Sequence, residues 1–187
     1  MKNLFALLML LAFSTSGLAQ YKNVGVFQFV EKKSDHTVKV IFKAKEFNRS
    51  AHKITYANQN YLLKREIAPA KGRQLMLKVD GREPLGTDGN VPNVEIESVK
   101  FLFDGKPIIV PRRLYTDCYN PNFEKDYLKV RLSDDLQSAF VFMSGSDAAG
   151  SYQVVWVLRK DGRHTRFSGS CPDCGFIDFK GGFFYEH

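Results

Sequence analysis

Apolar and polar residues alternate with a period of two along much of the chain. Val38, Val40 and Phe42 alternate with Lys39 and Lys43, residues 128–132 repeat this pattern, and residues 152–160 are a long, largely apolar stretch. Successive side chains of a β-strand point to opposite faces of its sheet, so this period predicts strands with one face in the core. Further strands are expected over residues 21–30, 75–79, 94–103, 108–110, 139–143, 163–167, 176–179 and 183–185.

Turn residues separate these segments. Asp80-Gly81 is a dipeptide typical of a tight hairpin turn, and residues 82–92, which include two prolines, predict a surface loop. The alternation changes phase near Ser98, where Val94 and Ile96 give way to apolar residues of the opposite parity. This change predicts a β-bulge or a bend between two sheets.

Residues 50–68 allow two interpretations. Ile54, Ala57 and Tyr61 recur at near-helical spacing. The same stretch also reads as two short strands, residues 54–56 and 61–63, around an asparagine-rich turn. Because asparagine is common in turns, the second interpretation is favoured.

Together these patterns predict an all-β chain, an antiparallel β-sandwich or barrel with about ten short strands and at most one short helix. The 16 phenylalanines and 8 tyrosines agree with this fold class, because aromatic residues are enriched in strands. No internal repeat or linker divides the chain. We therefore expect a single β domain over residues 20–187.

The first nineteen residues have a different pattern. A short basic start is followed by an unbroken apolar run over residues 4–13, and then by small and polar residues up to Ala19. This layout is typical of a secretory signal peptide that is cut before Gln20. The run is shorter than the about 20 residues that cross a bilayer. The sequence thus predicts an exported protein, secreted or periplasmic, that does not span a membrane.

Export changes the meaning of the charge balance. The chain has 27 Lys and Arg against 20 Asp and Glu, a net charge of +7. Outside the cytoplasm such a charge favours a protein partner, anionic lipid or an acidic envelope polymer over nucleic acid. The basic residues form no long run, so a generally basic soluble protein is the other interpretation. No cofactor is expected.

The candidate binding element is the loop of small residues at 144–152, between two apolar strands. Its hydroxyls and free backbone N–H groups suit a carboxylate, and its glycines permit close approach of a partner. The residues expected to contact the partner are Ser144, Gly145, Ser146, Ser151 and Tyr152. An ordinary flexible hairpin loop is the alternative.

A basic hairpin tip follows this loop in the sequence. With Asp161-Gly162 as a two-residue turn, Lys160 pairs with Arg163, and Arg159 with His164. Like charges opposite one another cost about 0.2–1 kcal/mol per pair, which is understandable where the tip binds an anionic group. Arg159, Lys160 and Arg163 are therefore candidate binding residues. A solvated hairpin end is the alternative.

The three cysteines are Cys118, Cys171 and Cys174. In an exported protein they favour one disulfide and one free thiol, and all three pairings stay open. The CxxC pair at 171–174 could instead contribute to a metal or redox site. It has no second CxxC, and it reads as a turn before a strand, so the disulfide role is favoured and no metal site is expected.

Enzyme signatures are few. The chain has no G-x-S-x-G, H-E-x-x-H or P-loop motif. Strand alternation explains Glu95 and Glu97, and a turn explains Asp134 and Asp135. A non-enzymatic binding protein is therefore favoured. An envelope-facing carbohydrate hydrolase is the alternative, and it requires carboxylates that converge in the fold.

The loop resembles one known family. A strand, a Ser-Gly-rich loop that ends in Tyr, and a second strand are similar to the bacterial periplasmic lysozyme inhibitors, over about 25 residues. The loop is longer than in that family, and the chain is larger. The resemblance implies a loop that inserts into the lysozyme cleft and meets its catalytic carboxylates beside a cation. The matching positions are Ser144, Gly145 and Tyr152, or Gly150, Ser151 and Tyr152, with the cation from Arg159, Lys160 or Arg163.

Overall fold

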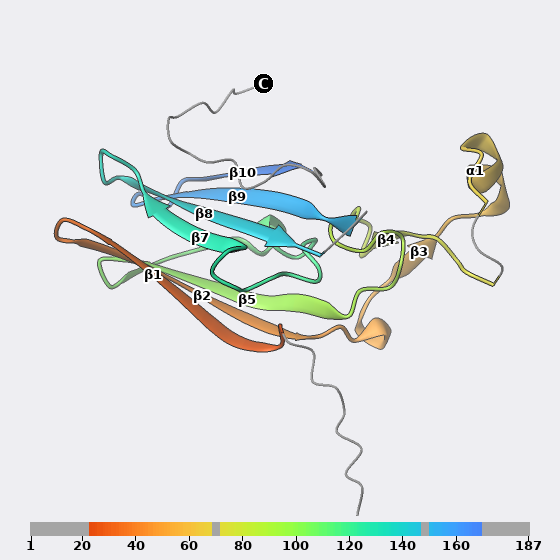
Figure 1. Cartoon of the computed structure of the whole chain (residues 1–187), viewed down its shortest axis with the longest axis horizontal. Coiled ribbons are helices and arrows are strands. Elements are labelled where there is room, and N and C mark those ends of the chain that lie inside the picture. Colours follow the sequence, from red (N-terminus) through yellow and green to blue (C-terminus); the bar gives the residue numbers. More distant parts are fainter. Residues whose placement is uncertain (1–22, 69–71, 147–149, 170–187) are drawn as a thin grey trace, which may run out of the picture.

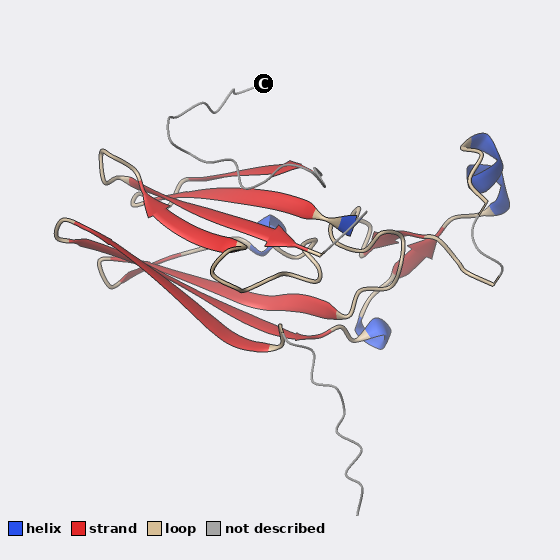
Figure 2. Ribbon diagram, in the orientation of Figure 1, coloured by secondary structure: helices blue, strands red, loops and turns tan. Residues whose placement is uncertain are grey.

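Two antiparallel sheets of four strands face each other in the computed structural model, which describes residues 23–68, 72–146 and 150–169. Figure 1 shows one sheet lying above the other, and Figure 2 shows the same layers as red strands. The first sheet has the order β1 (Gly25–Lys33), β2 (His36–Glu46), β5 (Val94–Phe103) and β6 (Lys106–Ile108). The second has the order β10 (His164–Gly169), β9 (Tyr152–Arg159), β8 (Ser138–Gly145) and β7 (Leu128–Leu132).

A third, two-stranded sheet and two of the short helices lie beside the sandwich, whereas the third short helix packs onto its core. The sheet pairs β3 (Ile54–Tyr56) with β4 (Met76–Val79), and the helices are η1 (Arg49–Ala51), α1 (Gln59–Lys64) and η2 (Arg112–Leu114). No helix in the described ranges is longer than six residues. The predicted all-β class and the β-sandwich are thereby confirmed. The expected strands near the C-terminus and the expected signal segment fall outside the described residues.

The core lies between the two main sheets, where the predicted alternation places it. Val38, Val40 and Phe42 are each 0% exposed. The ring of Phe42 lies 5.8 Å from that of Trp156 in the opposite sheet, and the indole N–H of Trp156 donates to the Leu114 carbonyl at 2.7 Å. One apolar cluster thus joins both sheets, and it holds the strand ends that position the candidate site.

The predicted bulge is present. Lys43 pairs with Ser98 and Ala44 with Ile96, so Glu97 is an extra residue in β5. The irregularity lies within one strand and does not separate two sheets. It explains the change in alternation, because one inserted residue reverses which parity faces the core.

The predicted strand over residues 61–63 is wrong. Residues 54–56 form β3 as expected, but residues 59–64 form the helix α1. Asn58 causes the difference, because its side-chain oxygen accepts a hydrogen bond from the backbone N–H of Tyr61 at 2.9 Å. Asparagine favours a helix N-cap as strongly as a turn, and here it caps a helix.

The predicted register of the last hairpin is also wrong, by one residue. Leu158 pairs with His164, and the backbone N–H of Arg159 donates to the Arg163 carbonyl at 2.9 Å. Three residues, 160–162, therefore form the loop, and Gly162 at its end has φ +85°. A three-residue loop with a left-handed last residue is the next most common hairpin type after the two-residue turn.

Candidate functional site

The described parts of the candidate loop pack against the body of the protein. The Ser144 N–H donates to the Tyr127 carbonyl at 2.8 Å, and the Ser146 N–H donates to the Asn120 carbonyl at 2.8 Å. Ser144, Ser146 and Ser151 are each partly buried, and residues 147–149 lie outside the described residues. Two backbone hydrogen bonds thus tie the first half of the loop to the segment that precedes β7.

Tyr152 is a buried residue of the candidate loop. Its side chain is 2% exposed, and its ring lies against two glycines. A Cβ atom on Gly145 would come within 2.4 Å of the tyrosine oxygen, and one on Gly86 within 2.7 Å of Cε1. Gly145 is buried as well. The ring fills the end of the core, and direct contact of Tyr152 and Gly145 with a partner stays a prediction.

Two of the three cationic side chains at the hairpin tip lie close to carboxylates. Lys160 Nζ lies 3.5 Å from a carboxylate oxygen of Asp104 and 4.3 Å from the centre of the Phe103 ring. Arg163 forms an ion pair of 2.6 Å with Asp161. Arg159 Nε is buried without a hydrogen-bond partner in the described structure. Lys160 thus links the two sheets, and the tip as a binding element stays a prediction.

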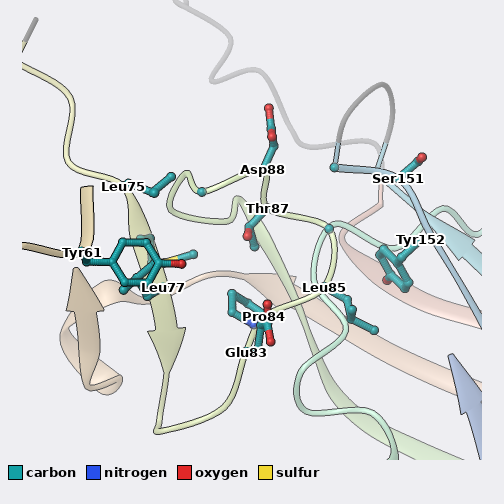
Figure 3. Close-up of a pocket in the computed structure, with 14 residues that line it drawn as sticks. Tyr61, Leu75, Leu77, Glu83, Pro84, Leu85, Thr87, Asp88, Ser151 and Tyr152 are labelled. Atoms are coloured by element: carbon teal, nitrogen blue, oxygen red, sulfur yellow. The ribbon is translucent and has the colours of Figure 1, made fainter. Parts of the chain in front are cut away.

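A pocket of about 350 Å³ borders the candidate loop (Figure 3). Figure 3 shows Tyr61, Leu75 and Leu77 on one side of it and Ser151 and Tyr152 on the other, with residues 83–89 running between them. It is lined by Tyr61, Leu75, Met76, Leu77, Glu83, Pro84, Leu85, Gly86, Thr87, Asp88, Gly89, Gly150, Ser151 and Tyr152. The pocket thus combines α1, β4, the loop after β4 and the start of β9.

The loop over residues 83–89 is held in a fixed path. Gly86 has φ +84°, and a Cβ there would lie 2.3 Å from the Tyr119 carbonyl oxygen, so the close approach requires glycine. The Gly86 carbonyl accepts a hydrogen bond from the Asn120 side-chain amide at 2.6 Å. The Asn120 side-chain oxygen accepts the backbone N–H groups of Asn93 and Val94 at 2.9 and 3.1 Å. One asparagine therefore connects this loop to the start of β5.

The pocket carries acidic groups, and two unpaired hydroxyls are buried beside it. Glu83 and Asp88 are both in its lining. The Ser151 hydroxyl and the Tyr152 hydroxyl are buried without a hydrogen-bond partner in the described structure, and burial raises the pKa of Tyr152 well above its usual value. The composition of the loop at 144–152 indicates Ser151 and Tyr152 as candidates. Glu83 and Asp88 have no such signal in the sequence, because residues 82–92 predict only a surface loop.

A charged cluster that sequence analysis did not find lies between β10 and the segment after η2. Asp117 is 9% exposed and accepts hydrogen bonds from Arg166 at 2.6 Å and from Arg82 at 3.0 Å. Arg82 also donates to the Thr116 hydroxyl at 2.9 Å. The side chain of Arg166 is only 13% exposed. These contacts describe a structural ion cluster that joins three distant segments.

Cys118 lies beside this cluster. It is 1% exposed, its Sγ is 3.8 Å from the Asp117 carboxylate, and burial raises the pKa of its thiol. Its partners in the expected disulfide, Cys171 and Cys174, are outside the described residues. The pairing of the three cysteines therefore stays a prediction.

A second unexpected cluster connects the small sheet to the sandwich. His52 Nδ1 lies 2.7 Å from a carboxylate oxygen of Asp80, and His52 Nε2 lies 2.7 Å from one of Glu95. The contact with Glu95 does not have the geometry of a hydrogen bond. Lys45 forms an ion pair with Glu95 at 3.1 Å. The ring of Phe47 stacks on His52 with centroids 4.6 Å apart. Stacking and charge contacts together fix β3 and β4 beside β5.

Acid is expected to weaken this connection. The hydrogen bond from His52 is the main cause that lowers the pKa of Asp80. A carboxyl whose pKa is lower in the folded chain stabilises it above the unfolded value of about 3.9, and this contribution is lost as the pH falls through the folded value. Since Asp80 is 53% exposed, the effect is below about 1 kcal/mol.

The measurement is the free energy of unfolding in urea at neutral pH and near pH 3. We expect Asp80→Asn to lose less stability on acidification than the wild-type protein. Asparagine suits the φ of +51° at this position. Asp35→Asn is the control, since Asp35 is exposed and has no ion pair in the described part of the chain. An equal acid response of Asp80→Asn and wild type would contradict the prediction.

The described residues contain no group of three or more His, Cys, Asp or Glu side chains that could hold a metal ion. None of the helices described there is long and apolar enough to cross a membrane. Comparison of the chain with models of known families, with curated proteins and with solved structures finds no match.

Proposed function

We propose that this chain is an exported, non-catalytic binding protein whose ligand site is the pocket between residues 83–89 and 150–152. The observation that carries the proposal is the pocket of about 350 Å³, whose lining combines the apolar side chains of Leu75 and Leu77 with the carboxylates of Glu83 and Asp88. Concave sites that combine apolar lining with a few polar groups are typical ligand sites in proteins. Export rests on the signal-like pattern of residues 1–19.

The lining supports a ligand with an apolar body and a cationic end. Leu75, Leu77 and Tyr61 supply apolar and aromatic surface, whereas Glu83 and Asp88 supply carboxylates. The lining contains no Lys, Arg or His among the described residues, although the whole chain has a net charge of +7. An acidic, partly apolar pocket in a basic protein favours a lysine or arginine side chain of a partner.

The placement of the two carboxylates favours binding over hydrolysis. Glycoside hydrolysis uses two carboxyl groups that flank the bond to be cut. Figure 3 shows Glu83 and Asp88 at different ends of the pocket, with the Asp88 side chain pointing away from Glu83. The carbohydrate-hydrolase alternative therefore has less support than binding. The CxxC alternative concerns residues outside the described structure.

The test is a titration of the protein with a small ligand, monitored through the protein's backbone NMR signals. N-acetyl-lysine amide is the probe, and N-acetyl-norleucine amide is its control, because it has a similar aliphatic chain without the charge. We expect the lysine probe to shift the signals of residues 83–89 and 150–152 and to bind at least about fivefold more tightly than the control, the gain of one charged hydrogen bond.

Matched variants assign the binding to the pocket. Glu83→Gln and Asp88→Asn are expected to weaken binding of the lysine probe and to leave the norleucine probe unchanged. Glu124→Gln is the control, because this carboxylate is exposed and is not part of the pocket lining. Signal changes that map elsewhere, or equal binding of the two probes, would overturn the proposed ligand chemistry.

We also propose, separately, the inhibitor function implied by the resemblance to periplasmic lysozyme inhibitors. The supporting observation is position: Ser151 belongs both to the candidate loop and to the pocket lining, so a protein seated over the pocket would touch the loop. The test is the rate at which lysozyme clears a suspension of bacterial cell walls. An unchanged rate with excess wild-type protein would contradict the inhibitor function and leave the pocket proposal to the NMR titration.

A further inference from the structure

The outer face of the first sheet carries a group of lysines that the pocket does not use. Val38, Val40 and Phe42 of β2 point into the core, so the residues between them point outward. Pairing of the strands places β1 and β5 on either side of β2. We call this surface the lysine face, and its basic residues are Lys32 on β1, Lys39, Lys43 and Lys45 on β2, and Lys100 on β5.

Carboxylates neutralise only part of the lysine face. Lys43 forms an ion pair with Glu97 at 2.8 Å, and Lys45 one with Glu95 at 3.1 Å. Within the ranges that the structure describes, Lys32, Lys39 and Lys100 form no ion pair. Three adjacent strands thus each present an unneutralised ammonium group on the same side, and the face keeps a net positive charge.

Apolar side chains lie among these lysines. Val26 is 67% exposed and Val30 is 46% exposed, both on the outer side of the edge strand β1. The strand register places Val30 beside Lys39, and Lys39 beside Leu102. Ile41 in turn lies beside Lys100. The lysine face thus combines positive charge with exposed apolar surface, the combination that suits a membrane interface.

We propose that the lysine face binds the surface of an anionic lipid bilayer. The charge is complementary to that of anionic headgroups. The flexible lysine stems allow the ammonium groups to reach phosphates while Val26 and Val30 meet the boundary between headgroups and acyl chains. An acidic polymer or an acidic protein would satisfy the charges but would leave no role for the valines. The inference does not rest on the pocket, which lies on another surface and is acidic.

The test is co-sedimentation of the protein, recovered in its exported form, with two kinds of vesicle. One contains about 30 mol % phosphatidylglycerol in phosphatidylcholine, and the other contains phosphatidylcholine alone. A lysine near an anionic surface changes the binding constant about fivefold. Lys39→Gln/Lys100→Gln should therefore bind the anionic vesicles about 25-fold more weakly than wild type, and the binding of wild type should fall with added salt.

The matched control is Lys64→Gln/Lys78→Gln, which removes the same charge from exposed sites on α1 and β4. We expect its binding to change less than about twofold. A loss equal to that of the lysine-face variant would overturn the proposal, because net charge alone would then explain binding. Equal binding of wild type to both kinds of vesicle would overturn it as well.

Val26→Ser/Val30→Ser distinguishes a bilayer from a soluble polyanion. These positions are exposed at a sheet edge, so the fold should tolerate serine. The variant should bind anionic vesicles several-fold more weakly and bind dextran sulfate as wild type does. Unchanged vesicle binding, with full competition by dextran sulfate, would show an acidic polymer as the partner and overturn the bilayer proposal.

Discussion

Tyr152→Ala is expected to destabilise the protein by about 3–5 kcal/mol, the range found when a large buried aromatic residue is truncated. The side chain is 2% exposed and packs against Gly86 and Gly145, where a Cβ atom would lie within 2.7 Å of the tyrosine ring. Neither glycine has a side chain that could move into the space. The measurement is urea unfolding followed by the fluorescence of Trp156, the single tryptophan of the chain.

Tyr152→Phe is the matched variant, and it should keep or raise the stability. The tyrosine hydroxyl is buried without a hydrogen-bond partner in the described structure, and such a group costs about 1–3 kcal/mol. Phenylalanine keeps the ring and removes that cost. If the fold survives Tyr152→Ala with less than about 1 kcal/mol lost, or if Tyr152→Phe is the more damaging change, the packing described for Tyr152 is wrong.

These two variants also separate the fold from the function. A loss of binding in Tyr152→Ala would not show that Tyr152 touches a ligand, because the wall of the pocket would change with the core. Tyr152→Phe retains the wall and removes one hydroxyl. Binding that survives Tyr152→Phe but is lost in Tyr152→Ala would therefore assign the loss to the changed wall of the pocket.

The sheets could be predicted from the sequence because their signal is local. The alternation at Val38, Val40 and Phe42 reflects a sheet with one face in the core, and the phase change near Ser98 reflects the bulge at Glu97. Where prediction was wrong, a residue type had two structural uses. Asn58 caps a helix although asparagine also favours turns, and Gly162 ends a three-residue loop although Asp-Gly also favours two-residue turns.

The pocket could be predicted only in part, because residues from four separate segments form it. Ser151 was found through the local composition of its loop. Glu83 contributes only because the loop after β4 passes beside the start of β9, and the contacts that hold this loop, such as Asn120 to the Gly86 carbonyl, join residues that are far apart in sequence. No periodicity or spacing carries that information.

The charges of the chain became informative only in three dimensions. Lys39 and Lys100 are 61 residues apart, yet they lie on adjacent strands of one face. Lys160, which sequence analysis assigned to anion binding, is instead close to Asp104. The net charge of +7 therefore combines a positive sheet face, an acidic pocket and several internal ion pairs, and each of these predicts a different partner.

Asp117→Ala is expected to destabilise the fold by about 3–5 kcal/mol, because it leaves a buried cation without its partner. The side chain of Arg166 is 13% exposed, and its Nη1 donates to Asp117 at 2.6 Å. Arg82 loses its contact too, but it is 39% exposed and retains Thr116 as a partner, so water compensates for much of that loss. The expected loss thus arises mainly from Arg166.

Replacing both Asp117 and Arg166 tests whether the unpaired cation causes the loss of stability. In Asp117→Leu/Arg166→Met the buried cation is gone, and apolar side chains of similar size fill the space. We expect this double variant to recover most of the stability that Asp117→Ala loses in the same unfolding measurement, since a well-packed apolar replacement of a buried ion pair is often neutral. A double variant as unstable as Asp117→Ala would show instead that the carboxylate stabilises the fold mainly through Arg82, to which it is also bonded at 3.0 Å.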